Sequence, residues 1–577
     1  MLDYDMMARH LESSGYSVTA RTYDGVPAIV INHSVGSHQV VLIHFEVSQF
    51  KRLPVFVLDN SASYGQLAHL LTVPDKTYGS LCVSETDALS VNYEQPHLAI
   101  EASLARHLDI LSKAILDPEW NKAELLREFQ ANWSFVCAHG DQELVVAAEE
   151  GSSETIEIFK PVDGAKFGLD SKLLGITESA HKLSDFSYIK WSQRRSNRKV
   201  CNASGYVLSV NELPLPPTSQ SSVKAWYLSL INTLPDTARS QFIQRAGSFR
   251  STEFWLVVNG PSPSGTVWFS LCLSSSKKRS LPFSADKLEP WSVDAREVVL
   301  FNPALLMPRS GADTGLLDKK VLLVGCGSVG SEIAVKLASA GVGNLTLLDP
   351  DDFELENLYR NALDISWVGL SKALALNYQI GSNYPWITVK GYTGRLLDSR
   401  TLQRELLTSF DLIVIAIGSP TQERLFQDHL LSHNIKTPVI NTWVEGYGVG
   451  GHASLDIPTS QGCLRCAYVD NAALTRGLSS NLNFLEDDQS LTVNHAGCGQ
   501  LFLPYSGINS AQTAIMASDL AVKYLRGLIT ESSQVSWKGP SADAEEKGFQ
   551  LTHRYYCFEQ SLEIVPLFNE YCDVCCS

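Results

Sequence analysis

The sequence predicts a multidomain α/β protein whose C-terminal part is a parallel, doubly wound sheet. The chain has 577 residues, too many for one hydrophobic core, so roughly two to four domains are expected. From about residue 310, apolar strand patterns alternate with helical patterns, which is typical of a parallel sheet. A glycine-rich turn, GCGSVGS, joins the first of these strands to a helix.

The N-terminal region, residues 1–150, mixes β and α patterns and is predicted to be an α+β domain. Segments 39–48 and 53–59 are apolar and are predicted to be strands. Segment 100–117 has helical spacing of its apolar residues and ends before Pro118, which is typical of a helix terminus.

The middle region, residues 151–305, is predicted to be a linker domain of mixed structure. Segments 253–259 and 266–274 are predicted strands, separated by turns rich in Pro, Ser and Gly. The run SSSKKRS at 274–280 is predicted to be a surface loop. Residues 306–577 then form the domain with the parallel sheet.

Composition and charge exclude several classes of protein. Hydrophobic residues make up 44% and charged residues 19%, which are globular proportions. We find no apolar run near the roughly 20 residues that a bilayer crossing needs, and the N-terminus lacks the pattern of a secretory signal. We therefore expect a cytoplasmic protein without a membrane partner. The net charge of -16 argues against nucleic-acid binding.

The glycine-rich turn predicts a phosphate-binding loop. Strand 320–324 runs into Gly325, Gly327 and Gly330, whose backbone amides can approach a phosphate. Asp349 ends the next strand, where an acid holds the ribose hydroxyls. This pattern fits NAD and ATP equally well, because both carry a ribose and a pyrophosphate.

The residues after this strand favour ATP. The string LLDPDDFELENLYRN carries Asp349, Asp351, Asn357 and Arg360, and Lys372 follows on the next helix. An NAD enzyme needs one acid here. A cluster that includes cations suits the cleavage of a triphosphate, because cations offset the charge that develops on pyrophosphate.

This string resembles the hallmark D-x-D-x-V-x-x-x-N-L-x-R of the ThiF/MoeB and ubiquitin-activating enzyme family. The resemblance implies a Rossmann-like adenylating domain that uses ATP and Mg²⁺ to adenylate a protein's C-terminal carboxylate. It implies Asp349 on the ribose, and Asn357, Arg360 and Lys372 around the phosphates, with Arg360 and Lys372 acting in catalysis. It also implies a homodimer, in which Arg309 corresponds to an arginine lent to the partner's site.

One position departs from the family. The family often places a magnesium-binding Asp after the strand that corresponds to DLIVIAIGSPTQERL (411–425), and counting along this segment brings Gly418 to that position. Either Asp351 takes the place of this acid, or this branch of the family does without it.

Two pairs of cysteines predict a metal site. Among the twelve cysteines, CLRC contains Cys463 and Cys466, and CDVC contains Cys572 and Cys575. Two CxxC pairs supply four thiolates, the ligand set of a tetrahedral structural Zn²⁺. The same paired arrangement accompanies the ThiF/MoeB fold.

Cys498 is the predicted nucleophile of the adenylating domain. It is flanked by two glycines and preceded by His495, in a loop that the family uses to cross over the adenylate site. Exposure and a nearby histidine favour a reactive thiolate, which would attack the acyl-adenylate and form a thioester. Cys557 in HRYYCFEQ is the rival candidate.

Cys82 is the predicted second acyl carrier. The order strand, strand, proline-bearing segment, G-x-L-C and helix resembles the core of a ubiquitin-conjugating enzyme, in which this cysteine receives the acyl group. The usual His-Pro-Asn is missing. His69, Asp75 and Asn92 are the nearby polar residues, and none is assigned as an oxyanion stabiliser.

The order of the three regions resembles bacterial anti-phage CBASS proteins, which attach a cGAS/DncV-like nucleotidyltransferase to targets. The resemblance implies that the partner's C-terminus is adenylated, carried on Cys498 and then Cys82, and joined to a lysine of an acceptor protein. It also implies that this primes the nucleotidyltransferase. Two alternatives stay open: a sulfur-carrier activator, which would not need residues 1–150, and a non-catalytic scaffold.

Overall fold

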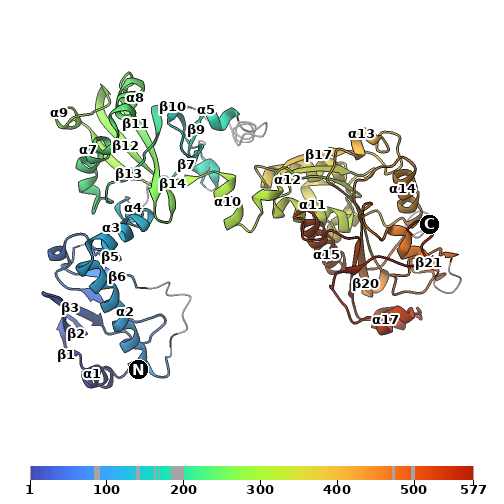
Figure 1. The fold of residues 1–577 in the computed structure, drawn as a ribbon, viewed down its shortest axis with the longest axis horizontal. Helices are drawn as coiled ribbons and strands as arrows, with labels where there is room; N and C mark the ends of the chain where they lie inside the picture. Colours follow the sequence, from blue (N-terminus) through green and yellow to red (C-terminus); the bar gives the residue numbers. More distant parts are fainter. Residues whose placement is uncertain are drawn as a thin grey trace. The chain divides into compact units, whose positions relative to one another are not determined.

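The computed structural model describes residues 2–73, 75–83, 91, 93–137, 143–161, 164–166, 168–182, 200–470, 475–494 and 501–575. The contacts divide these residues into two compact units (Figure 1). The N-terminal unit lies within residues 2–301 and the C-terminal unit within residues 302–575, and each is described by itself.

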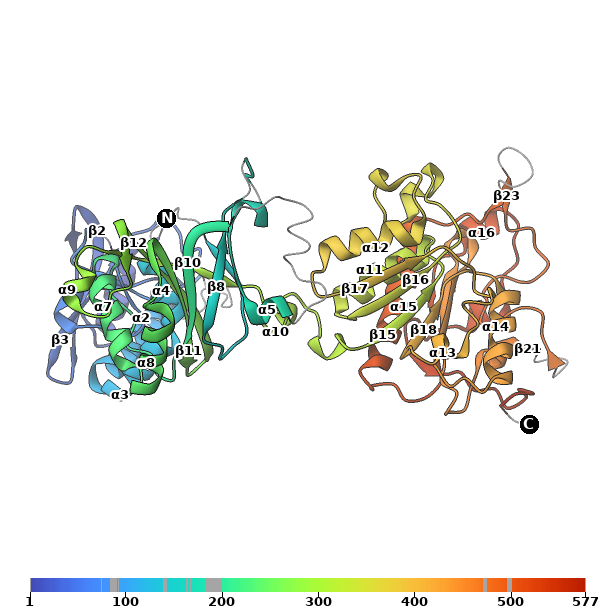
Figure 2. The ribbon, with the colours of Figure 1, turned by 90° about the horizontal axis from the view of Figure 1, so that it is seen from above.

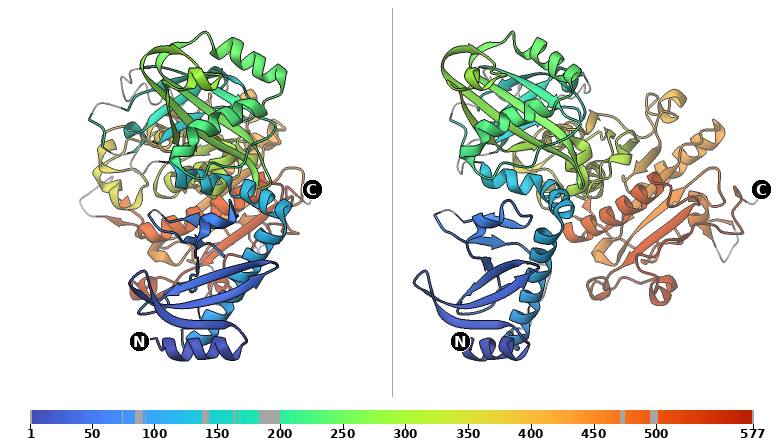
Figure 3. Two further views of the ribbon diagram at one scale, coloured as in Figure 1. Left: turned by 90° about the vertical axis from the view of Figure 1, so that its left-hand side faces the viewer. Right: turned by 60° about the vertical axis from the view of Figure 1, so that its left-hand side comes forward.

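The N-terminal unit begins with an antiparallel sheet that α1 (Tyr4–Ser13) and α2 (Pro96–Leu116) cover (Figure 3). Its strand order is β1 (Ser17–Tyr23), β2 (Val26–Val35), β3 (His38–Phe45), β4 (Val57–Leu58), β6 (Gly79–Leu81) and β5 (Leu70–Thr72). The helix predicted over 100–117 is confirmed as α2. It ends because Asp117 accepts a hydrogen bond from the Trp120 backbone N–H and so begins α3 (Pro118–Arg127).

A second sheet of eight strands follows. Its order is β13 (Ser292–Arg296), β12 (Gly265–Ser280), β11 (Arg250–Ser262), β10 (Val200–Ser209), β8 (Glu154–Phe159), β9 (Leu173–Thr177), β7 (Leu144–Ala147) and β14 (Val298–Leu300). The helices α4 (Phe129–Val136), α7 (Val223–Thr233) and α8 (Asp236–Ala246) pack into its core. Because β7 belongs to this sheet, the predicted boundary at residue 150 lies inside it.

The prediction of a surface loop at 274–280 is wrong. These residues form the end of β12, where Ser280 pairs with Arg250 of β11. The side chains of residues 276–280 are exposed, which explains the prediction. The backbone nevertheless continues the long hairpin, because β11 supplies a hydrogen-bonding partner.

The C-terminal unit contains the predicted doubly wound sheet (Figure 2). Its strand order is β17 (Thr388–Tyr392), β16 (Asn344–Leu348), β15 (Lys320–Val324), β18 (Leu412–Ile415), β19 (Val439–Val444), β20 (Gly450–Asp456), β25 (Ser533–Lys538) and β26 (Val565–Pro566). Pairing is parallel from β17 to β19, and antiparallel from β19 to β26.

Helices cover both faces of this sheet. Val321 and Leu323 of β15 face the core that includes α11 (Ser328–Ala340), α12 (Lys372–Asn383) and α15 (Gly507–Leu525). Leu322 and Val324 face the opposite core with α14 (Pro420–Ser432). Both faces are therefore buried, which explains the continuous apolar run of this strand. Among the described residues, no helix is both long and apolar enough to span a bilayer.

Candidate functional site

The glycine turn after β15 allows no larger side chain at two of its positions. Gly325 has a φ of +92°, and a Cβ there would lie 2.6 Å from the carbonyl oxygen of Ala416. A Cβ at Gly330 would lie 1.8 Å from the carbonyl oxygen of Gly325. Gly327 is the N-cap of α11, so the turn leads directly into the N-terminus of that helix, where free backbone N–H groups favour an anion.

Asp349 holds this turn in place. It is 5% exposed, and its carboxylate accepts hydrogen bonds from the backbone N–H groups of Cys326 (2.5 Å) and Asp351 (2.8 Å). Burial raises the pKa of Asp349, although these N–H groups and Lys372 lower it. The contact joins the ends of β15 and β16. The role of Asp349 on a ribose stays a prediction.

Lys372 and Asp351 lie together beside this turn. Lys372 begins α12 and is 8% exposed, and its Nζ lies 3.2 Å from an Asp351 carboxylate oxygen. The Lys372 backbone N–H also donates to the Asp351 carbonyl at 3.0 Å. A cation is thus held next to an acid that keeps 66% of its side chain exposed, available to Mg²⁺.

Arg360 is connected to the N-terminus of α11 by Tyr505, a residue that the sequence analysis did not predict to belong to the site. Its guanidinium lies 5.2 Å from the centre of the Tyr505 ring, and the Tyr505 hydroxyl lies 2.7 Å from Ser328 Oγ at the start of α11. Asn357, by contrast, accepts a hydrogen bond from the Glu354 backbone N–H (3.1 Å) and caps a short 3₁₀ helix.

Arg309 ends α10 (Pro303–Arg309), and no contact among the described residues joins its side chain to these groups.

Gly418 has a φ of +60° and open space around it. It lines a cavity of about 290 Å³, the Gly418 cavity, together with Val329, Tyr505 and the buried Glu423. Burial raises the pKa of Glu423 to about 7. The sequence pattern did not predict Glu423 as a site residue, because it stands five residues after the expected position of the magnesium-binding acid.

The four predicted zinc ligands lie together. The sulfur atoms of Cys463 and Cys572 are 3.8 Å apart, those of Cys466 and Cys575 3.7 Å, and those of Cys575 and Cys463 3.3 Å. Zn–S bonds of about 2.3 Å in a tetrahedron place sulfurs about 3.8 Å apart, so these residues fit a four-thiolate metal site.

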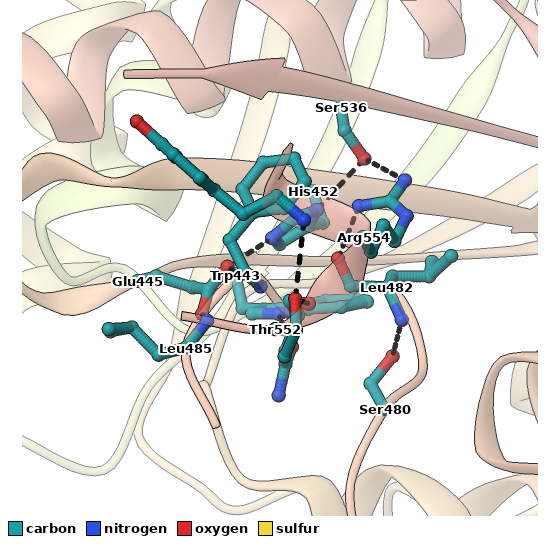
Figure 4. A network of polar contacts seen from close by, with 12 residues as sticks. Trp443, Glu445, His452, Ser480, Leu482, Leu485, Ser536, Thr552 and Arg554 are labelled. Carbon is teal, nitrogen blue, oxygen red and sulfur yellow. Dashed lines mark hydrogen bonds and ion pairs between the residues drawn. The ribbon is translucent and has the colours of Figure 1, made fainter. Parts of the chain in front are cut away.

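A buried polar network anchors the segment that leads toward Cys498 (Figure 4). The Glu445 carboxylate accepts hydrogen bonds from the backbone N–H groups of Phe484 (2.6 Å) and Leu485 (2.9 Å), and from His452 Nε2 (2.7 Å). Burial lowers the pKa of His452, so a neutral ring donates to Glu445 while its Nδ1 accepts from Ser536 (2.8 Å).

Cys498 itself lies outside the described residues. Strands β23 (Val493–Asn494) and β24 (Leu501–Phe502) pair on either side of it. Its rival Cys557 is exposed at the end of α17 (His553–Cys557), with its sulfur 3.5 Å from His553 Nε2. The choice between the two thiols stays open.

Cys82 is exposed and follows β6 directly. Its backbone N–H donates to the carbonyl of His69 at 2.9 Å, so His69 is the predicted polar neighbour that contacts it. Glu128 holds His69 twice, at the backbone N–H (3.1 Å) and at ring Nδ1 (2.8 Å), and Glu124 lies 3.4 Å from Nε2. Burial lowers the pKa of His69, but the two carboxylates outweigh it, so the net shift is upward.

The two other polar neighbours named for Cys82 do not complete a site. Asp75 is exposed with a φ of +60° and makes no contact with Cys82 among the described residues. Asn92 lies outside the described residues. No oxyanion stabiliser is assigned.

Comparison with known proteins agrees with this geometry. Residues 305–550 match the ThiF family. The chain is 26% identical over 325 residues to the ATP-dependent ubiquitin transferase-like protein Cap2 of Pseudomonas aeruginosa, which covers 55% of this chain and 56% of that protein. It is 22% identical over 527 residues to the protein of the same name from Escherichia coli strain TW11681, which covers 85% of each chain.

The sulfur carrier protein ThiS adenylyltransferase of Escherichia coli K12 is 30% identical over 157 residues, which cover 27% of this chain and 61% of that protein. The matches to the Pseudomonas aeruginosa protein and to this adenylyltransferase thus span little more than half of each relative's length. Residues 305–550 thus match the ThiF family, in a chain that is similar to a Cap2 ubiquitin transferase-like protein over most of its length.

Proposed function

We propose that this protein is an ATP-dependent adenylating enzyme that activates the C-terminal carboxylate of a protein and passes it on as a thioester. The observation that carries the proposal is the meeting of the glycine turn, Asp349, Asp351 and Lys372 at the carboxyl ends of β15 and β16. Ligands of open α/β sheets bind at this edge. Membership of residues 305–550 in the ThiF family supports the same chemistry.

The first step is an attack by the substrate carboxylate on the α-phosphorus of ATP. A C–O–P bond forms, the bond to the β-phosphate breaks, and pyrophosphate leaves. The N-terminus of α11 would hold the phosphates, and Lys372 and Arg360 would offset the charge on the leaving group. Asp351 would hold Mg²⁺, which would help to neutralise the phosphate charge, because Gly418 offers no side-chain ligand.

Two thiols would then carry the acyl group. The Cys498 thiolate attacks the acyl-adenylate, so a C–S bond forms and AMP leaves. The Cys82 thiolate takes the acyl group by thioester exchange, and a lysine amine of an acceptor protein finally forms an amide and releases the thiol. The exposure of Cys82 and the pairing of β23 with β24 around Cys498 support this relay.

The resemblance of the domain order to CBASS proteins leads us to propose a cGAS/DncV-like nucleotidyltransferase as the protein whose C-terminus is activated, and an anti-phage role in which the conjugation primes it. The enzyme would act as a homodimer, with Arg309 lent to the partner subunit, and the four cysteines would hold a structural Zn²⁺.

A sulfur-carrier activator is the second candidate, favoured by the likeness to ThiS adenylyltransferase. That likeness covers 27% of the chain and leaves Cys82 without a role. The conjugating relay accounts for the larger part of the molecule.

The test uses the full chain, ATP and a cGAS/DncV-like nucleotidyltransferase from the same genome, and follows pyrophosphate exchange and thiol-sensitive adducts on non-reducing gels. We expect Cys498→Ala to keep the exchange and lose every thioester, and Cys82→Ala to keep one thioester and lose transfer to lysine. A partner without its last residue is the control. Loss of the first thioester in Cys557→Ala, with Cys498→Ala unaffected, would reassign the nucleophile. Absence of exchange with the intact partner would refute the adenylation of this substrate.

A further inference from the structure

A second cavity, the α14 cavity, lies between α14 and strands β19 and β20. Its volume is about 370 Å³. Among the polar side chains that line it, four are buried carboxyl or amide groups, two from successive turns of α14 and two from the sheet. They are Glu423, Gln427, Asn441 and Asp456. Each is at least nine-tenths buried, with exposures of 2%, 6%, 2% and 9%.

The contacts leave each of these side chains with a free oxygen. One Glu423 oxygen accepts the Ser419 backbone N–H at 3.0 Å, and one Asp456 oxygen accepts Gln427 Nε2 at 2.6 Å and the Leu464 backbone N–H at 3.1 Å. The other oxygen of each carboxylate accepts no hydrogen bond from the described residues.

The two amides add the remaining oxygens. Because Gln427 Nε2 donates to Asp456, the orientation of this amide is fixed and its Oε1 is left buried without a donor. Asn441 Oδ1 is likewise buried and without a donor. Two buried amide oxygens and one oxygen of each carboxylate thus belong to residues that line one cavity, and none of the four accepts a hydrogen bond within the part of the chain that the structure describes.

Leaving the two amide oxygens buried without donors is costly unless something positive compensates them, because buried acceptors have lost their hydration. No ion pair involves Glu423 or Asp456 in the described part of the chain. Lys436 also lines the cavity, but it is exposed and pairs with neither acid. Carboxylate and amide oxygens are the ligands that hard cations take in proteins.

We propose that the α14 cavity binds one hard divalent cation, Mg²⁺ or Ca²⁺, through the free oxygens of Glu423, Gln427, Asn441 and Asp456. Cys463 and Cys575 of the thiolate site line the same cavity, but their soft sulfur ligands select other metals than these oxygens do. Asp351 and Lys372 do not line it. Glu423 lines the Gly418 cavity as well, so a cation here would fix the wall between the two cavities.

The experiment titrates the zinc-loaded full chain with Mg²⁺ alone and, in a separate arm, with Ca²⁺ alone, without nucleotide, and measures heat and stoichiometry. We expect one site for at least one of the two ions. Glu423→Gln and Asp456→Asn, which keep the shape and remove a charge, are expected to weaken binding about tenfold or more. Lys436→Ala, at an exposed position of the same cavity lining, is the matched control and should keep the affinity. Asp351→Asn reports whether the ion binds at Asp351 instead.

Zinc content and thermal unfolding without added cation report whether each variant folds. Should either acid variant fail to fold, Asn441→Leu removes one ligand oxygen without removing a charge, and the same loss of affinity is expected. Absence of binding of both ions up to about 5 mM would overturn the proposal, and the cavity would then hold water. Binding that disappears in Asp351→Asn and survives in Glu423→Gln would also overturn the proposal.

Discussion

The glycine turn after β15 and the strand end before Cys82 each place a candidate reactive group at the edge of a sheet, but they are fixed by different forces. The turn is fixed by backbone geometry, since Gly330 leaves no room for a Cβ, and by a strand buried on both faces. Cys82 is exposed, and it is held through His69 by the charges of Glu124 and Glu128. Packing changes little with pH, whereas the charge of an ion-paired histidine changes as the pH passes its pKa.

The largest effect is expected for Gly330→Ala. The new Cβ would lie 1.8 Å from the carbonyl oxygen of Gly325, so the turn must move and pyrophosphate exchange should fall by more than about 100-fold. Gly381→Ala is the control, because a Cβ there meets nothing within 4 Å and the position lies in α12. Equal exchange in the two variants would show that the turn tolerates displacement.

Lys372→Met should lower pyrophosphate exchange by roughly 100-fold, since the cation that offsets charge on the phosphates is lost. Thermal unfolding should change little. Lys336→Met, at an exposed position of α11, serves as the control. Discharge of a preformed Cys82 thioester to lysine should be unaffected, and a comparable loss there would mean that Lys372 acts beyond adenylation.

Glu128→Gln should affect transfer from Cys82 and not adenylation. Glutamine keeps one acceptor oxygen, so His69 loses either its ring or its backbone partner, at a cost of about 1 kcal/mol to the N-terminal unit. We expect slower transfer from Cys82 with unchanged pyrophosphate exchange, measured on the same preparation. Glu119→Gln, at an exposed position of α3, is the matched control. Unchanged transfer would show that the contacts of His69 with Glu124 and Glu128 do not affect the function of Cys82.

The smallest effect is a dependence on pH. The pKa of His69 is raised in the folded protein, because the two carboxylates outweigh burial. The stabilisation is therefore complete below the unfolded pKa of about 6.5 and is lost as the pH rises through the higher folded pKa. Hydrogen exchange of peptides that cover His69 and Cys82, corrected for the intrinsic rate, should increase over that interval. His69→Gln should abolish the increase, and a persistent increase would point to another group.

Much of the adenylating domain could be predicted from the sequence, because its constraints are local. The turn from β15 into α11 follows from glycine spacing, and the doubly wound sheet from the alternation of apolar segments. The CxxC pairs predicted a cluster that the structure brings together. Tyr505 and Glu445 could not be predicted, since they act on segments that lie far away in the sequence.

The sequence by itself determined the parallel sheet, the glycine turn and the identity of the four clustered cysteines, because each depends on residue type at fixed spacing. Only the tertiary structure decided that SSSKKRS continues a strand, that His69 is the neighbour of Cys82, and that two buried carboxyl and two buried amide side chains line the α14 cavity. These features depend on which surfaces and charges meet across the fold, and a linear pattern carries no information about those distances.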